Sequence, residues 1–366
     1  MDMERIYQEA ARLLREMCAI PAPAGGERTR AEYARSYWTE KGAKNVYVDG
    51  ADNCVWQTEG DGPYALFCAH TDTVFPDTQP MPMTEENGVL KCPGCGDDTA
   101  NLAVLMAVTG AMLEEKRPLH NVIFAADSGE EGLGNLKGIR AIMERYRGRI
   151  RYVVSFDCHL GFVTDGCVGS ERYRMTLRTQ GGHSYFDYGR PSAVHEMAKI
   201  VCEIYESPLP EGKGTATKNV GVFEGGTSVN AIPQTALALY EHRSDDRERL
   251  DALRADFERI TAGKAGLTVE NIGNRPCKGD VDEAAQRALV ERCLMATAKH
   301  TGAACRPQTA STDCNVPLSM GVPACCAGLV RGGGMHTREE WVEVVSLKTG
   351  IQVALDILAP ETGGVK

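Results

Sequence analysis

Three short apolar runs limit the fold of this chain more than any other feature. Residues 64–69, 121–126 and 151–156 are each dominated by apolar side chains without a regular polar alternation. Such runs are typical of strands that are buried on both faces of a parallel sheet. Helical patterns at residues 101–115 and 136–146 separate them, so strands and helices alternate along the chain. This order predicts an α/β fold with a mixed, largely parallel sheet, helices on both faces and right-handed crossovers.

Polar residues follow each run at the point where the strand ends. His70 and Asp72 follow the first run, Glu130 and Glu131 follow the second, and Asp157 follows the third. In open α/β sheets, ligands bind beyond the carboxyl ends of the strands. The sequence therefore predicts a functional site at this edge of the sheet.

The middle of the chain has a different order of elements, strand, helix, strand, strand, helix, strand, which is that of a ferredoxin-like split unit. The expected strands and helices are, in chain order, 172–179, 192–206, 219–224, 235–243, 246–260 and 267–272. After Pro276, an apolar run and further helical patterns indicate that the first sheet resumes. We therefore predict a discontinuous domain, residues 1–168 and 277–366, with a small α+β domain, residues 169–276, inserted into it.

Composition excludes several classes of protein. The 40 basic and 50 acidic side chains give a net charge of −10, which argues against nucleic acid or an anionic membrane as a partner. No apolar stretch reaches the roughly 18–20 residues of a membrane span, and the first residues do not resemble a signal peptide. The 14 cysteines are scattered without a repeated spacing. We therefore expect reduced thiols and a cytoplasmic protein.

Two of the eight histidines stand in settings that suggest a metal site. His70 follows a strand, and His336 follows the glycine run 332–334, whose bare backbone allows close approach to a ligand. With the nearby carboxylates they form a donor set that suits Zn²⁺, with Mn²⁺ or Co²⁺ tolerated. Two ions about 3.5–4 Å apart need a shared ligand. Either Asp97 or Asp98 could supply the bridging carboxylate.

Each group of polar residues also has a structural explanation. Asp97 and Asp98 could cap a helix, and the two adjacent glutamates could be acids at a helix start. Cys92 and Cys95 have the spacing of a redox pair, so a cysteine-dependent redox protein is an alternative. The metal site is favoured because the structural explanations would have to hold independently at one sheet edge.

These motifs resemble those of the M20 family of dinuclear zinc metallopeptidases, which includes peptidase T-like aminopeptidases, dipeptidases and deacylases. The motifs are His70-Thr-Asp72, Gly96-Asp97-Asp98, Ser128-Gly-Glu130-Glu131-Gly132, Asp157 and His336. The resemblance covers essentially the whole chain. It implies a catalytic domain, an inserted lid domain and a homodimer that forms through the lid.

The resemblance also implies the ligands of two zinc ions. His70 and Asp157 would bind one ion, Glu131 and His336 would bind the other, and Asp97 would bridge them. Asp72 would act beside the metals. It would hydrogen-bond the far nitrogen of His70 and fix the tautomer of its ring.

The remaining roles implied by the resemblance belong to the general base and to the lid. Glu130 would take a proton from the attacking water and later deliver it to the leaving amine. His183, in Gly181-Gly-His183-Ser184, would reach from a partner subunit to polarise the scissile carbonyl. Asn230 would bind substrate, and Arg243 would bind a substrate carboxylate, which suits its bidentate guanidinium.

The chain departs from the family pattern in two places. The family often has Asp-Asp-Lys-x-Gly where this chain has Asp97-Asp98-Thr99-Ala100-Asn101, which leaves Asp98 as an alternative bridging residue. Many deacylase-type members carry Glu where this chain has Asp157, and Asp there leans towards the aminopeptidase and dipeptidase branches.

The function expected from these residues is metal-dependent hydrolysis of an amide bond in a small substrate, a di- or tripeptide. The first alternative is a deacylase that acts on N-acyl amino acids, which would share the metal site. The second is a metal-binding protein without catalytic activity, which would need neither Glu130 nor Asp72.

Overall fold

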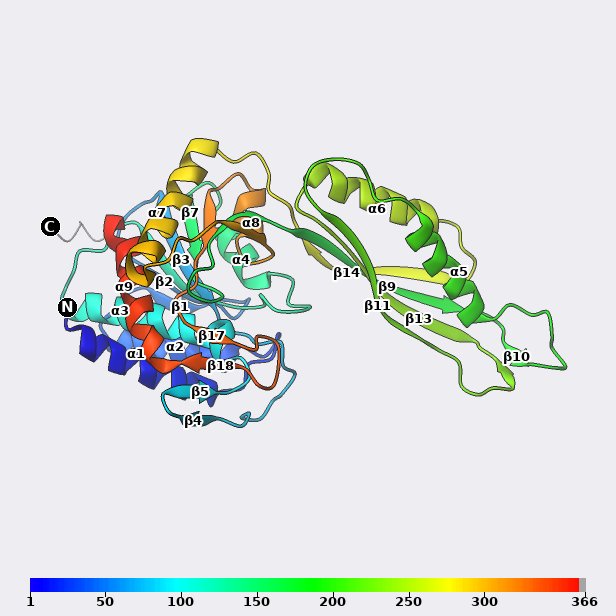
Figure 1. Cartoon of the computed structure of the whole chain (residues 1–366), viewed down its shortest axis with the longest axis horizontal. Helices are drawn as coiled ribbons and strands as arrows, with labels where there is room; N and C mark the ends of the chain where they lie inside the picture. The colour runs from blue at the N-terminus through cyan, green and yellow to red at the C-terminus, as the bar shows by residue number, and fades with distance from the viewer. Residues whose placement is uncertain (362–366) are drawn as a thin grey trace. The chain divides into compact units, whose positions relative to one another are not determined.

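The computed structural model describes residues 1–361, which form two compact units. The first unit comprises Met1–Cys167 and the chain from Asp280 onward, and the inserted unit comprises Val168–Gly279. Figure 1 shows the elements of both units with the labels used below.

The first unit is built on a six-stranded sheet with the strand order β1-β2-β6-β3-β7-β16. Neighbouring strands from β6 to β16 are parallel, whereas β1 and β2 run antiparallel to their neighbours. In sheet order the strands are β1 (Val46–Val48), β2 (Cys54–Gln57), β6 (Val122–Asp127), β3 (Tyr64–His70), β7 (Ile150–Ser155) and β16 (Ala324–Cys326). The sheet is mixed and largely parallel, as the apolar runs predicted.

Helices cover both faces of this sheet (Figure 1). Phe67 and Phe124 pack against one set of helices, and Leu66 and Ile123 face the opposite side. The first set is α1 (Met3–Cys18), α2 (Arg28–Glu40), α3 (Ala100–Glu114), α7 (Glu283–Thr301) and α9 (Leu347–Leu358). The other face is covered by α4 (Lys137–Arg145) and α8 (Asn315–Ser319). Together with the sheet, these helices confirm the predicted fold class.

Helix α3 is the central helix of the first unit, and its sequence explains its position. Of its 15 residues, 12 are buried, and a helix that is apolar around its whole circumference lies inside a core. A short helical turn, η1 (Cys95–Thr99), leads directly into it and carries Asp97 and Asp98, which are joined by a cis peptide bond. The buried helix therefore fixes the segment on which both acids lie.

Two smaller sheets hold loops around the edge of the main sheet. One has the order β17-β18-β5-β4, and the other pairs β15 with β8 in parallel. Their strands are β4 (Thr84–Glu86), β5 (Val89–Lys91), β8 (Thr164–Cys167), β15 (Gln308–Ala310), β17 (Gly332–Gly333) and β18 (Trp341–Glu343). The ladder through β5, β18 and β17 ties the segment before η1 to the segment before His336.

The inserted unit has the predicted order of strands and helices. Its four-stranded antiparallel sheet has the order β11-β13-β9-β14. In chain order the elements are β9 (Gly169–Arg178), α5 (Ala193–Glu206), β11 (Ala216–Gly225), β13 (Thr235–Ser244), α6 (Arg247–Thr261) and β14 (Leu267–Arg275). Both helices lie on one face, over a core that includes Tyr173, Tyr240 and Phe257 (Figure 1). This is the ferredoxin-like arrangement.

The sequence did not predict α2, β1 or β2. Helix α2 is rich in charged residues, and its buried residues include Arg30, so its pattern does not show a clear apolar stripe. The strands β1 and β2 have only three and four residues. Among residues 1–361, no helix combines the length and apolar character that crossing a membrane requires.

Candidate metal centre

Five predicted metal ligands come from five separate segments of the first unit. The strands β6, β3 and β7 are adjacent and parallel, so their carboxyl ends share one edge of the sheet. His70 is the last residue of β3, and Glu131 and Asp157 follow β6 and β7. Asp97 lies in η1, and His336 follows β17.

The Asp97 carboxylate lies between the two imidazoles. Its Oδ1 is 3.1 Å from Nε2 of His70, and its Oδ2 is 3.0 Å from Nε2 of His336. The same nitrogen of His336 is 3.3 Å from Oε1 of Glu131. Ligand atoms of His70, Asp97 and Asp157 lie within 4.8 Å of one another, and so do those of Asp97, Glu131 and His336. The two groups share only Asp97, so the geometry can hold two cations bridged by one carboxylate.

Asp98, the alternative bridging residue, has other partners. Its Oδ2 accepts a hydrogen bond from the backbone N–H of His70 at 3.0 Å, and its Oδ1 accepts one from Nδ2 of Asn101 at 2.6 Å. The carboxylate therefore ties η1 to the end of β3. Of the two acids, Asp97 is the one that contacts both imidazoles.

Asp72 positions three residues of the site. Nδ1 of His70 is 3.1 Å from the backbone oxygen of Asp72 and 3.5 Å from its Oδ1. Because a carbonyl oxygen can only accept, Nδ1 carries the proton and Nε2 is left to bind a cation. The carboxylate of Asp72 accepts the backbone N–H groups of Glu130 at 3.1 Å and Glu131 at 2.8 Å.

Glu130 lies beside the predicted ligands. It is 6% exposed, and one of its oxygens lies within 4.8 Å of ligand atoms of His70 and Glu131. An oxygen of Glu131 belongs to the same group, so the two adjacent carboxylates approach the His70 imidazole together. Glu130 is therefore a buried carboxylate directly beside the predicted metal ligands.

The charges of the site are poorly balanced without cations. Burial, and then repulsion from Asp97, raise the pKa of Asp157 to about 6. Its Oδ1 is buried and has no hydrogen-bond partner among residues 1–361. Hydrogen bonds to Asp97 and then to Glu131 raise the pKa of His336 to about 10. Because buried carboxylates need partners, these oxygen and imidazole donors fit a pair of divalent cations.

Glu340 supports the metal ligands, although no sequence motif indicated it. Its carboxylate accepts the backbone N–H groups of Gly94 at 2.7 Å and of Gly96 and Asp97 at 2.8 Å each. Burial raises its pKa to about 7. Glu340 lies 243 positions beyond Asp97, so sequence spacing gave no signal for this contact.

Thr99 and Asn101, which stand where the family often has Lys and Gly, make contacts that hold the loops around the site. Nη1 of the buried Arg30 donates to Oγ1 of Thr99 at 3.0 Å and to the backbone oxygen of Thr71 at 2.9 Å. Asn101 donates to the backbone oxygen of Cys158 at 2.9 Å, and its own Oδ1 accepts the backbone N–H of Leu329 at 2.8 Å. Thr99 and Asn101 thus connect η1 to the loops around it.

The inserted unit carries His183, exposed at one end of its short ladder of β10 (Gly182–His183) and β12 (Ala231–Ile232). Its Nδ1 accepts the backbone N–H groups of Tyr185 at 3.2 Å and Phe186 at 3.4 Å. Since Nδ1 is an acceptor here, the neutral ring carries its proton on Nε2. Nε2 of His183 can therefore donate a hydrogen bond.

The other two predicted residues of the inserted unit are also accessible. Asn230 is exposed, and its Oδ1 accepts a hydrogen bond from the Ser228 hydroxyl at 3.0 Å. Arg243 donates to both carboxylate oxygens of Glu241 at 2.9 and 3.0 Å, while about a third of its side chain remains exposed.

The structure gives no support to the redox alternative. Cys92 and Cys95 are 1% and 0% exposed. Their sulfurs donate to the backbone oxygens of Pro93 at 3.7 Å and Leu90 at 3.9 Å. Redox motifs that exchange disulfides need an accessible sulfur, and these two are enclosed.

Comparisons with known proteins relate the chain to a family and to a fold. Residues 66–359 match the family described as "Peptidase family M20/M25/M40". The chain is 27% identical over 340 residues to the uncharacterized protein YqjE of Bacillus subtilis, covering 87% of each chain. It is 26% identical over 315 residues to a succinyl-diaminopimelate desuccinylase of Methylorubrum extorquens, covering 78% of this chain and 80% of that one. A tripeptidase from Staphylococcus aureus has the same fold, with a TM-score of 0.75, 20% identity and coverage of 98% and 99%.

Proposed function

The chain belongs to peptidase family M20/M25/M40, and we propose that it hydrolyses the amide bond of a di- or tripeptide with Glu130 as the general base. As a member of this family it is a hydrolase of the metallopeptidase and amidohydrolase class. The alternative of a metal-binding protein without activity is therefore set aside. The position of Glu130 beside two overlapping groups of metal donors carries the proposal.

The chain's own donors would hold two cations. His70 and Asp157 would bind one, Glu131 and His336 the other, and Asp97 would bridge them. We propose Zn²⁺, with Mn²⁺ or Co²⁺ accepted by the same nitrogen and oxygen donors. When bound, such a pair lowers the pKa of water towards about 7 and polarises an amide carbonyl.

Glu130 would move the proton. Its backbone is fixed by the carboxylate of Asp72 at 3.1 Å, so its side chain starts from a defined position. It would accept a proton from the attacking water as the C–O bond forms. It would then donate that proton to the amide nitrogen as the C–N bond breaks, so that the leaving group departs as a neutral amine.

Residues of the inserted unit would recognise the substrate. The tautomer of His183 places a donor at Nε2, which would stabilise the negative charge that develops on the carbonyl oxygen. Asn230 would bind the substrate, and Arg243 would bind its carboxylate. We propose that His183 acts from a partner subunit, so that the active enzyme is a homodimer joined through the inserted unit and located in the cytoplasm.

A deacylase that acts on N-acyl amino acids is the second candidate. It is favoured by the similarity over 315 residues to a protein named as a succinyl-diaminopimelate desuccinylase. The peptidase is favoured by Asp157 at the strand end and by the fold shared with a protein named as a tripeptidase. Both reactions would use the same metal ligands and the same base.

One experiment separates the candidates and tests the metal requirement. The protein is stripped with a chelator, reloaded with Zn²⁺, Mn²⁺ or Co²⁺ singly, and assayed on di- and tripeptides beside N-acetyl and N-succinyl amino acids. We expect no hydrolysis after chelation and recovery at two metal ions per chain, with peptides as the better substrates. Faster hydrolysis of the acyl amino acids would establish the deacylase, and full activity in the stripped protein would disprove the metal mechanism.

A further inference from the structure

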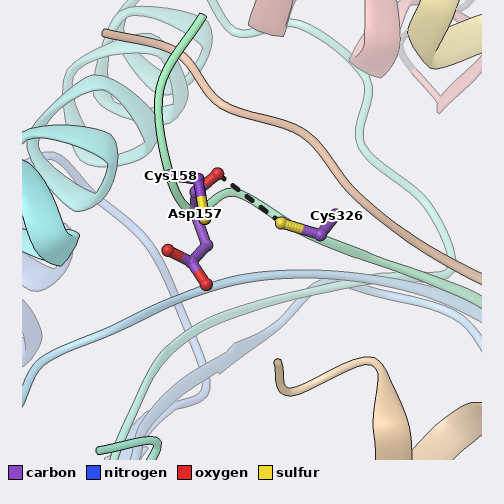
Figure 2. Close-up of side chains that lie close together, drawn as sticks. All are labelled: Asp157, Cys158 and Cys326. Carbon is purple, nitrogen blue, oxygen red and sulfur yellow. Dashed lines mark hydrogen bonds between the residues drawn. The ribbon is translucent and has the colours of Figure 1, made fainter. Parts of the chain in front are cut away.

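A pair of thiols lies beside the predicted ligand Asp157 and takes no part in the proposed reaction. Cys158 follows Asp157 after β7, and Cys326 ends the neighbouring parallel strand β16. The Cys326 sulfur donates to the backbone oxygen of Asp157 at 3.5 Å. Figure 2 shows this sulfur directed at the main chain of Asp157, next to the Cys158 thiol.

The three side chains form a group of potential metal ligands. One carboxylate oxygen of Asp157 and the sulfurs of Cys158 and Cys326 lie within 4.8 Å of one another. Zn–S bonds of about 2.3 Å place two sulfurs about 3.8 Å apart on a tetrahedral ion. Small changes in side-chain angles would therefore bring all three donors onto one cation.

We propose that Asp157, Cys158 and Cys326 form a third cation site, adjacent to the two-metal centre, for a thiophilic divalent ion such as Zn²⁺ or Cd²⁺. Thiolates select such ions over Mg²⁺ or Ca²⁺. The two thiols release their protons to solvent as the metal–sulfur bonds form. A water molecule would complete a tetrahedral coordination shell.

The backbone at Cys158 supports a ligand role. Its φ of 67° lies in the left-handed region, which a side chain with a Cβ adopts at a cost. His336, a predicted ligand of the main centre, has a φ of 62°. Non-glycine residues in this region persist where the surrounding structure requires them, often at ligand-binding positions.

Accessibility distinguishes this group from another in the same unit. Cys68, Asp127 and Asp313 also bring ligand atoms within 4.8 Å of one another, but each is 0% exposed. Two neighbouring acids can share a proton and need no metal. Cys158, in contrast, is only partly buried, although Cys326 beside it is 0% exposed.

Asp157 belongs to both the third site and the main centre. Its ligand atoms group with His70 and Asp97 as well as with the two thiols. An ion on the thiols would therefore draw on a carboxylate that the main centre also uses. Excess zinc is expected to bind here and to lower the activity of the enzyme.

Cadmium is a suitable probe because its bonds to sulfur produce an ultraviolet charge-transfer band. The full-length protein, loaded with two Zn²⁺ per chain and kept reduced with a phosphine, is titrated with Cd²⁺. The same titration is run on Cys158→Ser, Cys326→Ser and the control Cys325→Ser. Cys325 is the neighbour of Cys326 and donates to the backbone oxygen of Thr164 at 3.2 Å, outside the proposed site.

We expect the wild type and the Cys325→Ser variant to bind one more Cd²⁺ per chain than either other variant. The charge-transfer band should fall at least two-fold in Cys158→Ser and in Cys326→Ser. Equal bands and equal stoichiometry in all four proteins would overturn the proposal. This measurement does not depend on catalysis, so its failure is distinct from failure of the proposed function.

Two further measurements keep the proposal testable if a serine variant fails to fold. In wild-type crystals soaked in excess Zn²⁺, an anomalous peak should lie about 2.3 Å from both sulfurs, and its absence would contradict the site. Activity in ten-fold excess Zn²⁺, relative to activity at two equivalents, should fall at least two-fold in the wild type. In Cys158→Ser the same ratio should stay near one.

Discussion

Buried carboxylates occur in both units of this protein, but their surroundings are opposite. In the inserted unit, Glu171 is 1% exposed and accepts hydrogen bonds from Arg254 at 2.6 Å, from Asn274 at 3.3 Å and from the hydroxyl of Tyr173. In the first unit, Asp157 is 4% exposed and one of its oxygens has no partner among residues 1–361.

The pKa values reflect this difference. Burial raises the pKa of Glu171, but the imidazole of His242 at 3.6 Å and hydrogen bonds from Arg254 and Tyr173 outweigh it and bring the value down to about 2. Burial and repulsion from Asp97 raise the pKa of Asp157 to about 6, because they outweigh the lowering effects of His70 and Cys158. A carboxylate with donors stabilises the folded state, whereas one without them lowers stability until a cation binds. The two environments therefore distinguish a carboxylate that stabilises the fold from one that we propose to be a metal ligand.

The largest expected effect is on kcat, when the proposed general base Glu130 in the first unit is replaced. Glu130→Gln should lower kcat by about 10²–10⁴-fold, because an amide cannot accept the proton of the attacking water. Metal content should not change, since Glu130 is not among the five proposed ligands. The measurements are kcat on the best peptide of the substrate panel and metal content per chain.

The matched control for this variant is Glu144→Gln. Glu144 lies in α4 of the same unit, with 66% of its side chain exposed and a salt bridge to Arg147, and exposed pairs of this kind contribute little. Its kcat should equal that of the wild type. A Glu130→Gln enzyme within a few-fold of the wild type would remove the general base from the mechanism.

In the inserted unit, Glu171→Gln should cost about 2–3 kcal/mol of stability at pH 7. The pKa of Glu171 is lower in the folded state than its ordinary value of 4.5. Its stabilisation is therefore present above pH 4.5 and is lost as the pH falls towards 2. Urea unfolding of the variant and the wild type at several pH values should show the difference shrinking below pH 4.5.

The control for this effect is Glu270→Gln in β14. Glu270 pairs with Arg174 at 2.9 Å, but 60% of its side chain is exposed, so its loss should cost less than about 1 kcal/mol. A Glu171 variant that is as stable as this control would show that the hydrogen bonds of the buried carboxylate do not stabilise the unit.

Asp157→Asn should stabilise the metal-free protein, whereas Glu171→Gln should destabilise it. The pKa of Asp157 is raised in the folded state, so its ionised form costs stability above about pH 6. Asparagine carries no charge, and the stripped variant should be about 1–2 kcal/mol more stable than the stripped wild type at pH 8. The gain should vanish by about pH 4, where the wild-type carboxyl is also neutral.

Bound metal should change the difference in stability between the wild type and the Asp157→Asn variant. With excess Zn²⁺, the wild type gains stability by binding cations, and the variant, with one ligand weakened, gains less. Thermal melting with and without metal measures both effects. An Asp157 variant that is destabilised in the absence of metal would show that the carboxylate has stabilising partners after all.

The sequence predicted the sheet edge well because the signal is local. The strands that end at His70 and before Asp157 are apolar runs, and any parallel sheet brings such ends together. The grouping of three acids with two imidazoles was also predicted, since three of these residues end or follow apolar strands and the other two lie in η1 and after β17. The antiparallel strands β1 and β2 were missed because three or four residues carry too little pattern.

The supporting contacts could not be predicted, because each depends on residues far apart in the chain. Glu340 and Arg30 contact η1 across 243 and 69 positions, respectively. The Asp72 carboxylate lies 3.5 Å from Nδ1 of His70, as expected, but its backbone oxygen lies nearer at 3.1 Å and the carboxylate also holds the glutamate pair, which no pattern indicated. Such details depend on how loops pack together, which no local pattern records.

An effect on stability of the same size as that of Asp157→Asn is expected for one of these supporting contacts. Oγ1 of Thr99 accepts from Arg30 at 3.0 Å and donates to the backbone oxygen of Gly94 at 2.6 Å. Thr99→Ala removes both bonds and leaves a buried guanidinium with fewer acceptors, at an expected cost of about 1–2 kcal/mol. Since Thr99 adjoins the acids of η1, metal affinity should fall about ten-fold. Thr99→Ser, which retains the hydroxyl, should restore both values.

Thr39 provides the matched control, because its hydroxyl donates to the backbone oxygen of Arg35 at 2.7 Å on the exposed surface of α2. Thr39→Ala should change stability by less than about 0.5 kcal/mol and leave metal affinity unaltered. If Thr99→Ala had equally small effects, Arg30 would not need this acceptor. The threonine at this departure from the family pattern would then be a tolerated substitution rather than a support for the metal ligands.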